Sequence, residues 1–154
     1  MSEINLFKFE NNNFNLKDLL LFWRKNKKHD KSNVHILFVD DEDFAIVSNL
    51  KKAGWVVDKI KDLKNIEDEV VKRAQIIFVD FKGVGKTLSE NEEGIGIIKS
   101  LKNTYKDSKR VILYSGHNRF SLKDDIKSAD NYLAKNSDTY EFIKIITEEI
   151  SKLK

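Results

Sequence analysis

The stretch from His35 to Phe44, HILFVDDEDF, joins an apolar run directly to a cluster of acidic residues. Residues 36–39 (ILFV) have the composition of a buried β-strand, and residues 40–43 (DDED) follow without a break. Neighbouring carboxylates repel one another, and nothing in a fold requires four of them immediately after a buried strand. We therefore expect a positively charged partner close to the end of this strand.

Strand-like and helix-like segments alternate from residue 34 to the end of the chain. The predicted strands are Val34–Val39, Trp55–Ile60, Gln75–Asp80, Arg110–Ser115 and Asn131–Ala134. The predicted helices are Phe44–Ala53, Ile66–Arg73, Ile95–Thr104, Leu122–Ser128 and Tyr140–Leu153. We expect Glu42 or Asp43 to cap the first helix and Ser137 or Asp138 to cap the last. Strands that alternate with helices in this way predict an α/β domain, whose parallel sheet is covered on both faces.

The composition excludes several classes of protein. The chain of 154 residues is 40% hydrophobic and 34% charged, which suits one globular domain. It contains no cysteine, so disulfides and thiolate zinc sites are impossible. No stretch approaches the roughly 20 apolar residues that cross a bilayer, and the N-terminus lacks the features of a secretory signal. We expect a cytoplasmic protein without a membrane partner.

The first 33 residues form an extension outside the domain of residues 34–154. They carry seven basic and four acidic residues, which accounts for the whole net charge of +3. Residues 15–28 (NLKDLLLFWRKNKK) predict an amphipathic helix capped by Asn15, with an apolar face that must be covered. Its own domain, a partner or a second copy in a homodimer could cover this face. No DNA-reading motif accompanies the basic residues, so we expect no direct contact with nucleic acid.

Polar side chains follow four of the predicted strands. The first strand ends at Asp40 and Asp41, the third at Asp80 and the fourth at Ser115, and the fifth runs into Lys135. Because the carboxyl ends of parallel strands meet at one edge of a sheet, we expect these side chains to share one cleft. Clustered carboxylates are tolerable there if they hold a hard divalent cation, and Mg²⁺ is bound in this way.

The same residues predict phosphoryl chemistry. Asp80 stands alone at the end of the central strand, and a carboxylate can attack a phosphoryl group to form an aspartyl phosphate. Phosphoryl transfer needs little beyond positioning and neutralisation of charge. Mg²⁺ held by Asp41 and Asp80, with Asp40 acting through water, would neutralise part of that charge. Lys135 would pair with a second phosphoryl oxygen, and the hydroxyl of Ser115 would donate to a third.

Residues 34–153 resemble the receiver domains of two-component response regulators. The resemblance rests on four motifs in the family's order: VHILFVDDEDF at residue 34, IIFVDF at 76, VILYSGH at 111 and SADNYLAK at 128. It implies a flavodoxin-like fold with strand order 2-1-3-4-5. It also implies a signalling module that is modified once and reset slowly, without turnover of a substrate. The donor would be a histidine kinase or a phosphotransfer protein.

The resemblance assigns a role to each residue at the strand ends. Asp40 and Asp41 match the acidic pair, Asp80 the phosphoacceptor, Ser115 the switch hydroxyl and Lys135 the family's lysine. It further implies that the backbone carbonyl of Lys82 completes the Mg²⁺ shell. Tyr132 matches the switch aromatic residue. Phosphorylation would draw Ser115 inward, Tyr132 would follow, and the surface of the last two helices would change its affinity for a downstream partner.

Three features depart from the family pattern. Asn136 replaces the proline that usually follows the lysine, and a non-proline cis bond costs about 3–4 kcal/mol, so we expect a trans or rebuilt loop after Lys135. The loop after Asp80, residues 81–93, is longer than usual and contains no proline. It could shield the site, recognise a donor or have no role. The chain ends at Lys154, so we expect no output domain.

Two enzyme-like alternatives fit the motifs less well. Residues 83–87 (GVGKT) resemble the second half of a P-loop, but the pattern needs glycine at position 80, where this chain has aspartate. A haloacid-dehalogenase-like phosphohydrolase would match Asp41-Glu42-Asp43 after the first strand, VILYSG at the fourth and then a lysine. That reading leaves Asp80 without a role. Its fourth motif, an acidic pair at a later strand end, has no candidate after Lys135, because Glu148 and Glu149 lie within the last predicted helix.

A third alternative is a pseudo-receiver, a phosphorylation-independent interaction module that retains the acidic residues. We disfavour it because unused carboxylates would be free to drift. If the domain is phosphorylated, His117, two residues after Ser115, is a candidate for tuning the lifetime of the phosphoryl group.

Overall fold

The computed structural model describes residues 29–117 and 119–154. The helix predicted at residues 15–28 therefore lies outside the described residues. A helix long and apolar enough to cross a membrane is absent from the part of the chain that the structure describes.

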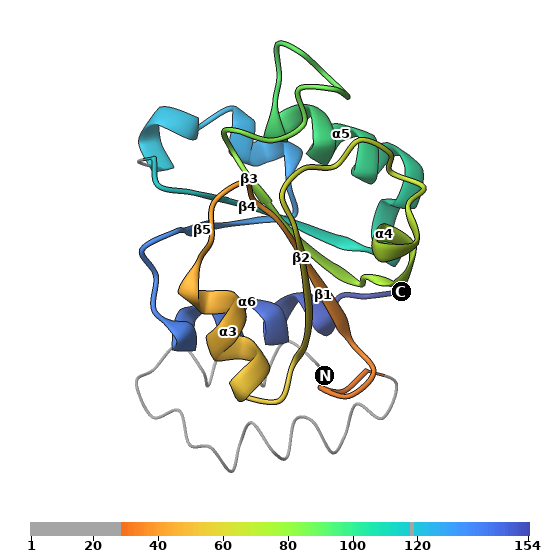
Figure 1. Cartoon of the computed structure of the whole chain (residues 1–154), viewed down its shortest axis with the longest axis vertical. Helices are drawn as coiled ribbons and strands as arrows, with labels where there is room; N and C mark the ends of the chain where they lie inside the picture. Colours follow the sequence, from red (N-terminus) through yellow and green to blue (C-terminus); the bar gives the residue numbers. More distant parts are fainter. Residues whose placement is uncertain (1–28, 118) are drawn as a thin grey trace.

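A parallel sheet of five strands forms the centre of the domain (Figure 1). Its strands are β1 (His35–Val39), β2 (Val56–Ile60), β3 (Ile76–Asp80), β4 (Arg110–Ser115) and β5 (Asn131–Ala134). Their order, β2-β1-β3-β4-β5, confirms the predicted flavodoxin-like topology. The first three strands begin one residue later than predicted, and the last two agree at both ends. In the register of the sheet, Asp80 lies opposite Tyr114 and Ser115 opposite Ala134.

Four α-helices of the described chain connect and cover the strands. They are α3 (Ala45–Lys52), α4 (Glu69–Arg73), α5 (Gly94–Tyr105) and α6 (Thr139–Ile150), and a short 3-10 helix, η1 (Lys106–Ser108), follows α5. Asp138 caps α6 in a reciprocal capping box with Glu141, as one of the two predicted alternatives requires. The predicted cap of α3 is wrong, because Phe44, and neither Glu42 nor Asp43, occupies the N-cap, without a side-chain hydrogen bond. Asp43 instead pairs with Lys59 at 3.1 Å.

The helix predicted at Leu122–Ser128 is also wrong. Two 3-10 helices, η2 (Arg119–Leu122) and η3 (Asp125–Ser128), occupy this region. Leu122 is buried and Ile126 is half-buried, while charged residues separate them. Tertiary packing of an apolar face supplies most of the stability of short helices, and from residue 121 to residue 128 only Leu122 and Ile126 are apolar. One of them lies in each short turn.

Two apolar layers cover the two faces of the sheet. One layer is aromatic: Phe38 and Phe78 stack at 4.6 Å between ring centroids, and Tyr114 and Phe142 pack beside them under α3 and α6. The other layer is aliphatic and lies beneath α4 and α5. All five residues of β3 are buried, as expected for the central strand of a doubly covered sheet. This rigid sheet fixes the positions of the residues at its carboxyl edge.

Candidate functional site

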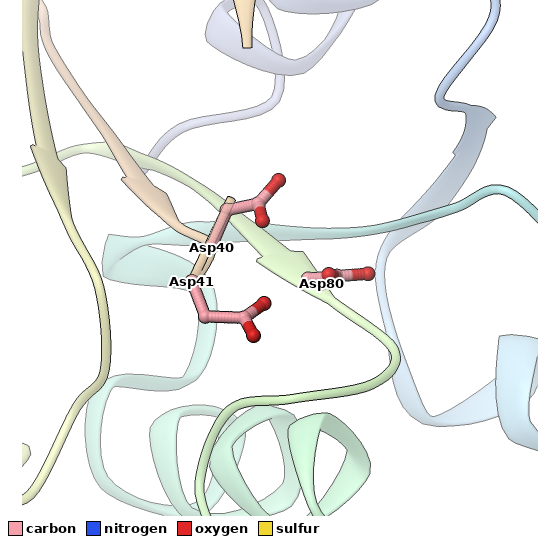
Figure 2. A group of neighbouring side chains, drawn as sticks. All are labelled: Asp40, Asp41 and Asp80. Carbon is pink, nitrogen blue, oxygen red and sulfur yellow. The ribbon is translucent and has the colours of Figure 1, made fainter. Parts of the chain in front are cut away.

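The carboxyl edge of the sheet brings the predicted acidic residues together. Figure 2 shows Asp40 and Asp41, which follow β1, beside Asp80, the last residue of the neighbouring strand β3. Each can offer a carboxylate oxygen so that all three lie within 4.8 Å of one another. Asp40 and Asp80 are buried, whereas Asp41 is exposed. Oxygen ligands so close together, with one open to solvent, fit a hard divalent cation.

Lys135 joins two of these carboxylates. Its Nζ lies 2.7 Å from Oδ2 of Asp80 and 3.0 Å from Oδ2 of Asp40. The backbone N–H of Lys135 donates to the carbonyl of Ser115 at 2.9 Å, which extends the ladder between β4 and β5. The described chain contains no cis peptide bond, so the bond before Asn136 is trans, as predicted. The contact of Lys135 with Asp80 thus forms with asparagine as the next residue.

The buried charges perturb one another. Burial raises the pKa of the Asp80 carboxyl above its usual range, the ion pair with Lys135 opposes this rise, and the charge of Asp40 adds to it. Burial disfavours the ammonium form of Lys135, but its hydrogen bonds to Asp80 and Asp40 outweigh that effect and hold the pKa of Lys135 above its usual value. A bound cation would favour the charged carboxylates.

Asp40 is fully buried and has three hydrogen-bond donors. Its Oδ1 accepts from the backbone N–H of Glu42 at 2.9 Å, and its Oδ2 accepts from Lys135 and from the hydroxyl of Tyr114. We did not predict the role of Tyr114 from the sequence. The available signal is a tyrosine among the aliphatic residues of β4 (RVILYS), directly before the strand-end serine.

Two glycines allow close approaches at Asp41 and Asp80, to a side chain in the first case and to the backbone in the second. Gly83 has φ of +84°, and a Cβ there would lie 2.5 Å from Oδ1 of Asp41. A Cβ at Gly94 would lie only 1.8 Å from the backbone oxygen of Asp80. Glycine is therefore needed at both positions. Together with Lys82, Gly83 lines a pocket of about 410 Å³ that opens beside Asp80 and Lys135.

The long loop after β3 is attached at several points, and it projects beyond the strand ends (Figure 1). The N–H of Gly83 donates to Glu93 at 2.7 Å, the N–H of Gly85 donates to Asp62 at 2.6 Å, and the side chain of Val84 between them is buried in the aliphatic layer. This arrangement differs from a P-loop, because a carboxylate accepts the N–H of Gly83 and α5 begins only at Gly94.

Ser115 and Tyr132 both form hydrogen bonds with His117. The buried Oγ of Ser115 accepts the N–H of His117 at 3.0 Å and lies 3.1 Å from Nδ1 of the same residue. The hydroxyl of Tyr132 donates to the carbonyl of His117 at 2.9 Å. The imidazole also packs edge-on against Phe81, with 5.5 Å between ring centroids. His117 thus contacts both candidate switch residues and the residue after Asp80.

Glu149 lies at the opposite edge of the sheet. It is fully buried in α6 and pairs with Arg110 at 2.7 Å and with Lys152 at 2.8 Å, and it accepts a hydrogen bond from Asn131 at 3.0 Å. Arg110 and Asn131 begin β4 and β5, so Glu149 is far along these strands from the carboxyl ends. Glu149 therefore does not supply the fourth acidic motif of a phosphohydrolase.

No protein family model matches the sequence, and a comparison with curated proteins found no match. Solved structures do match. The receiver domain of NtrX from Brucella abortus shares 20% identity at a TM-score of 0.60, over 75% of this chain and 98% of that one. A CheY-like receiver domain protein from Methanospirillum hungatei JF-1 shares 19% identity at a TM-score of 0.59, over 79% and 97%.

A response regulator from Thermotoga maritima is similar at a TM-score of 0.57 and 20% identity, over 77% of this chain and 98% of that one. Longer NtrX structures also match, and the aligned part of this chain spans about a quarter of their length, 27% in the complex with ATP. Sheet order, helix placement and these similarities agree. The chain has the fold of response regulator receiver domains.

Proposed function

We propose that this chain is a phosphoacceptor receiver domain of a two-component or phosphorelay system, in which Asp80 accepts a phosphoryl group in a Mg²⁺-dependent step. The observation that carries the proposal is the contact of one ammonium group, that of Lys135, with both Asp80 and Asp40 at the strand ends. A phosphoryl oxygen on Asp80 would lie within reach of this ammonium after a small movement, because Asp80 is already its partner.

The donor set suits Mg²⁺. Asp40, Asp41, Asp80 and the backbone carbonyl of Lys82 would hold the ion, which when bound neutralises negative charge on the phosphoryl oxygens. The buried members, Asp40 and Asp80, have charged partners from this chain already, and the exposed Asp41 faces the pocket. The candidate ligands are thus all oxygen atoms, which are the ligands that a hard cation such as Mg²⁺ prefers.

The residues at the strand ends have distinct tasks in the transfer. A carboxylate oxygen of Asp80 attacks the phosphorus of a phosphohistidine donor, and the P–N bond breaks. The imidazole leaves with the electron pair of that bond and is protonated by solvent, and Asp80 becomes an acyl phosphate. Lys135 exchanges its contact with Asp80 for one with a phosphoryl oxygen. The hydroxyl of Ser115 turns from His117 to donate to another oxygen.

The modification would then change partner binding. Tyr132 donates to the carbonyl of His117, so movement of Ser115 away from His117 would alter the surroundings of Tyr132. The surface formed by η2, η3, β5 and α6 would present different side chains to a downstream protein. A histidine kinase or a phosphotransfer protein would supply the phosphoryl group.

Intact mass after incubation with acetyl phosphate, with and without Mg²⁺, tests the proposal. We expect one added phosphoryl group on the wild-type protein, dependent on Mg²⁺, and none on Asp80→Asn. Asp107→Asn is the matched control, because Asp107 is half-exposed and pairs with Lys154 before β4 begins, at the far edge of the sheet. It should be modified like the wild type.

Two results would contradict the proposal. The absence of an adduct, under conditions that modify a known receiver domain, would favour the phosphorylation-independent interaction module. Repeated turnover of a phosphomonoester would favour a hydrolase, because a receiver domain is modified once and resets slowly.

A further inference from the structure

Tyr114 lies beside the acidic cluster, and its aromatic ring packs in the core of the domain. The ring is fully buried and packs edge-on against Phe38 and Phe78, with centroid distances of 5.6 Å and 5.9 Å. Such pairs contribute about 0.5–1.5 kcal/mol beyond the area they bury. The packing of the ring therefore contributes to the position of Tyr114 independently of its hydroxyl.

The hydroxyl of Tyr114 forms a hydrogen bond with a carboxylate oxygen of Asp40, one of the predicted metal ligands. It donates to Oδ2 of Asp40, the same atom that Lys135 contacts at 3.0 Å. The ammonium of Lys135 also lies 5.3 Å from the centre of the Tyr114 ring. Burial and the neighbouring carboxylates, Asp40 first among them, raise the pKa of Tyr114, which keeps the hydroxyl protonated as a donor.

Two kinds of partner compete for the negative charge of Asp40. In this structure, the hydroxyl of Tyr114 and the ammonium of Lys135 both stabilise this fully buried carboxylate. A divalent cation would stabilise the same charge more strongly. A donor that stabilises the metal-free state more than the metal-bound state weakens metal binding, because affinity depends on the difference between the two states.

We propose that Tyr114 is a positioning residue that sets the Mg²⁺ affinity of the site by hydrogen-bonding Asp40. This inference rests on the proposed function, since it requires Mg²⁺ to bind at Asp40, Asp41 and Asp80.

Magnesium titration of Tyr114→Phe tests the inference. The substitution keeps the ring in its aromatic layer and removes only the hydroxyl. Binding is followed through the backbone amide resonance of Gly83, which lies against Asp41. We expect the dissociation constant for Mg²⁺ to fall about three- to tenfold, a fraction of the effect of a full hydrogen bond to a charged group.

Two further proteins separate a direct effect from a structural one. In an Asp40→Asn background, Tyr114→Phe should leave Mg²⁺ affinity nearly unchanged, because the charge through which the hydroxyl acts is gone. Tyr105→Phe is the matched control, since it removes a hydroxyl that donates to the carbonyl of Ile66 at 2.8 Å, away from the site. It should bind Mg²⁺ like the wild type.

Each result bears on the inference. Tighter binding in Tyr114→Phe that disappears in the Asp40→Asn background supports it. Unchanged or weaker binding in Tyr114→Phe, with normal binding by the wild type, overturns the inference and leaves the proposed function intact. Failure of the wild-type protein to bind Mg²⁺ overturns both.

Discussion

The ammonium group of Lys135 lies 2.7 Å from Oδ2 of Asp80, at the point where β5 and β3 end. Lys135 is mostly buried, and a second carboxylate, Asp40, lies 3.0 Å from the same nitrogen. One cation therefore neutralises two buried anions that would otherwise repel each other. This relationship makes the stability of the metal-free protein depend on the same residues as its proposed chemistry.

Lys135→Met should destabilise the protein and make it more dependent on Mg²⁺. We expect a loss of about 1–3 kcal/mol in the free energy of unfolding without Mg²⁺, because two buried carboxylates lose their shared partner. Added Mg²⁺ should restore more stability to the variant than to the wild type, since the cation replaces the missing charge. Urea unfolding with and without Mg²⁺ measures both effects.

The control for this variant is Lys99→Met. Lys99 pairs with Glu92 on the surface, where both side chains are about half exposed. Such pairs contribute about 0–1 kcal/mol, so this variant should resemble the wild type. Equal Mg²⁺ dependence of Lys135→Met and Lys99→Met would contradict the role of Lys135 as the internal neutralising charge.

Asp80→Asn should stabilise the metal-free protein at neutral pH. The pKa of Asp80 is raised in the folded protein, chiefly by burial, so the folded state retains a proton that the unfolded chain releases near its ordinary value of 3.8. Stability therefore falls as pH rises from that value through the folded pKa, and the loss persists at neutral pH. Asp80→Asn does not lose this stability, because the asparagine side chain has no proton to release in this pH range. Urea unfolding should show its advantage at pH 7 and none below the ordinary pKa; an advantage that grows on acidification would contradict the assignment.

The strands and the site could be predicted because both follow from short-range patterns. Strands buried on both faces are continuous apolar runs, and Ile76–Asp80 is fully buried. Parallel strands bring their carboxyl ends to one edge, so Asp40, Asp80 and Lys135 could be placed together before any contact was known.

The remaining features depend on contacts between distant parts of the chain. The hydroxyl of Tyr114 meets Asp40 across 74 positions, and no local pattern encodes that pair. The loop after Asp80 is held by Asp62 through a hydrogen bond across 23 positions. Residues 122–128 were predicted as a helix from the alternation of strand-like and helix-like patterns. From residue 121 to residue 128 only the buried Leu122 and the half-buried Ile126 are apolar, which is too few to stabilise that helix.

Gly94→Ala should damage both stability and the site. A Cβ at this position would lie 1.8 Å from the backbone oxygen of Asp80, so α5 or β3 must move. We expect a loss of about 2–3 kcal/mol in the free energy of unfolding, as for other overpacked sites, and slower phosphorylation of Asp80. Gly116→Ala is the control, because no atom lies within 4 Å of its added Cβ. Equal thermal unfolding of the two variants would contradict the close approach.

His117→Ala should accelerate phosphorylation of Asp80. In the wild-type protein, Oγ of Ser115 is held by the N–H and Nδ1 of His117 and must leave the imidazole to reach a phosphoryl oxygen. Removing the imidazole removes one hydrogen bond, about 1 kcal/mol, so we expect the rate of adduct formation to rise about fivefold. Time-resolved intact mass with acetyl phosphate measures the rate. The increase should be absent in a Ser115→Ala background, because the imidazole acts through that hydroxyl; an equal increase there would show that His117 acts by another route, such as its contact with Phe81.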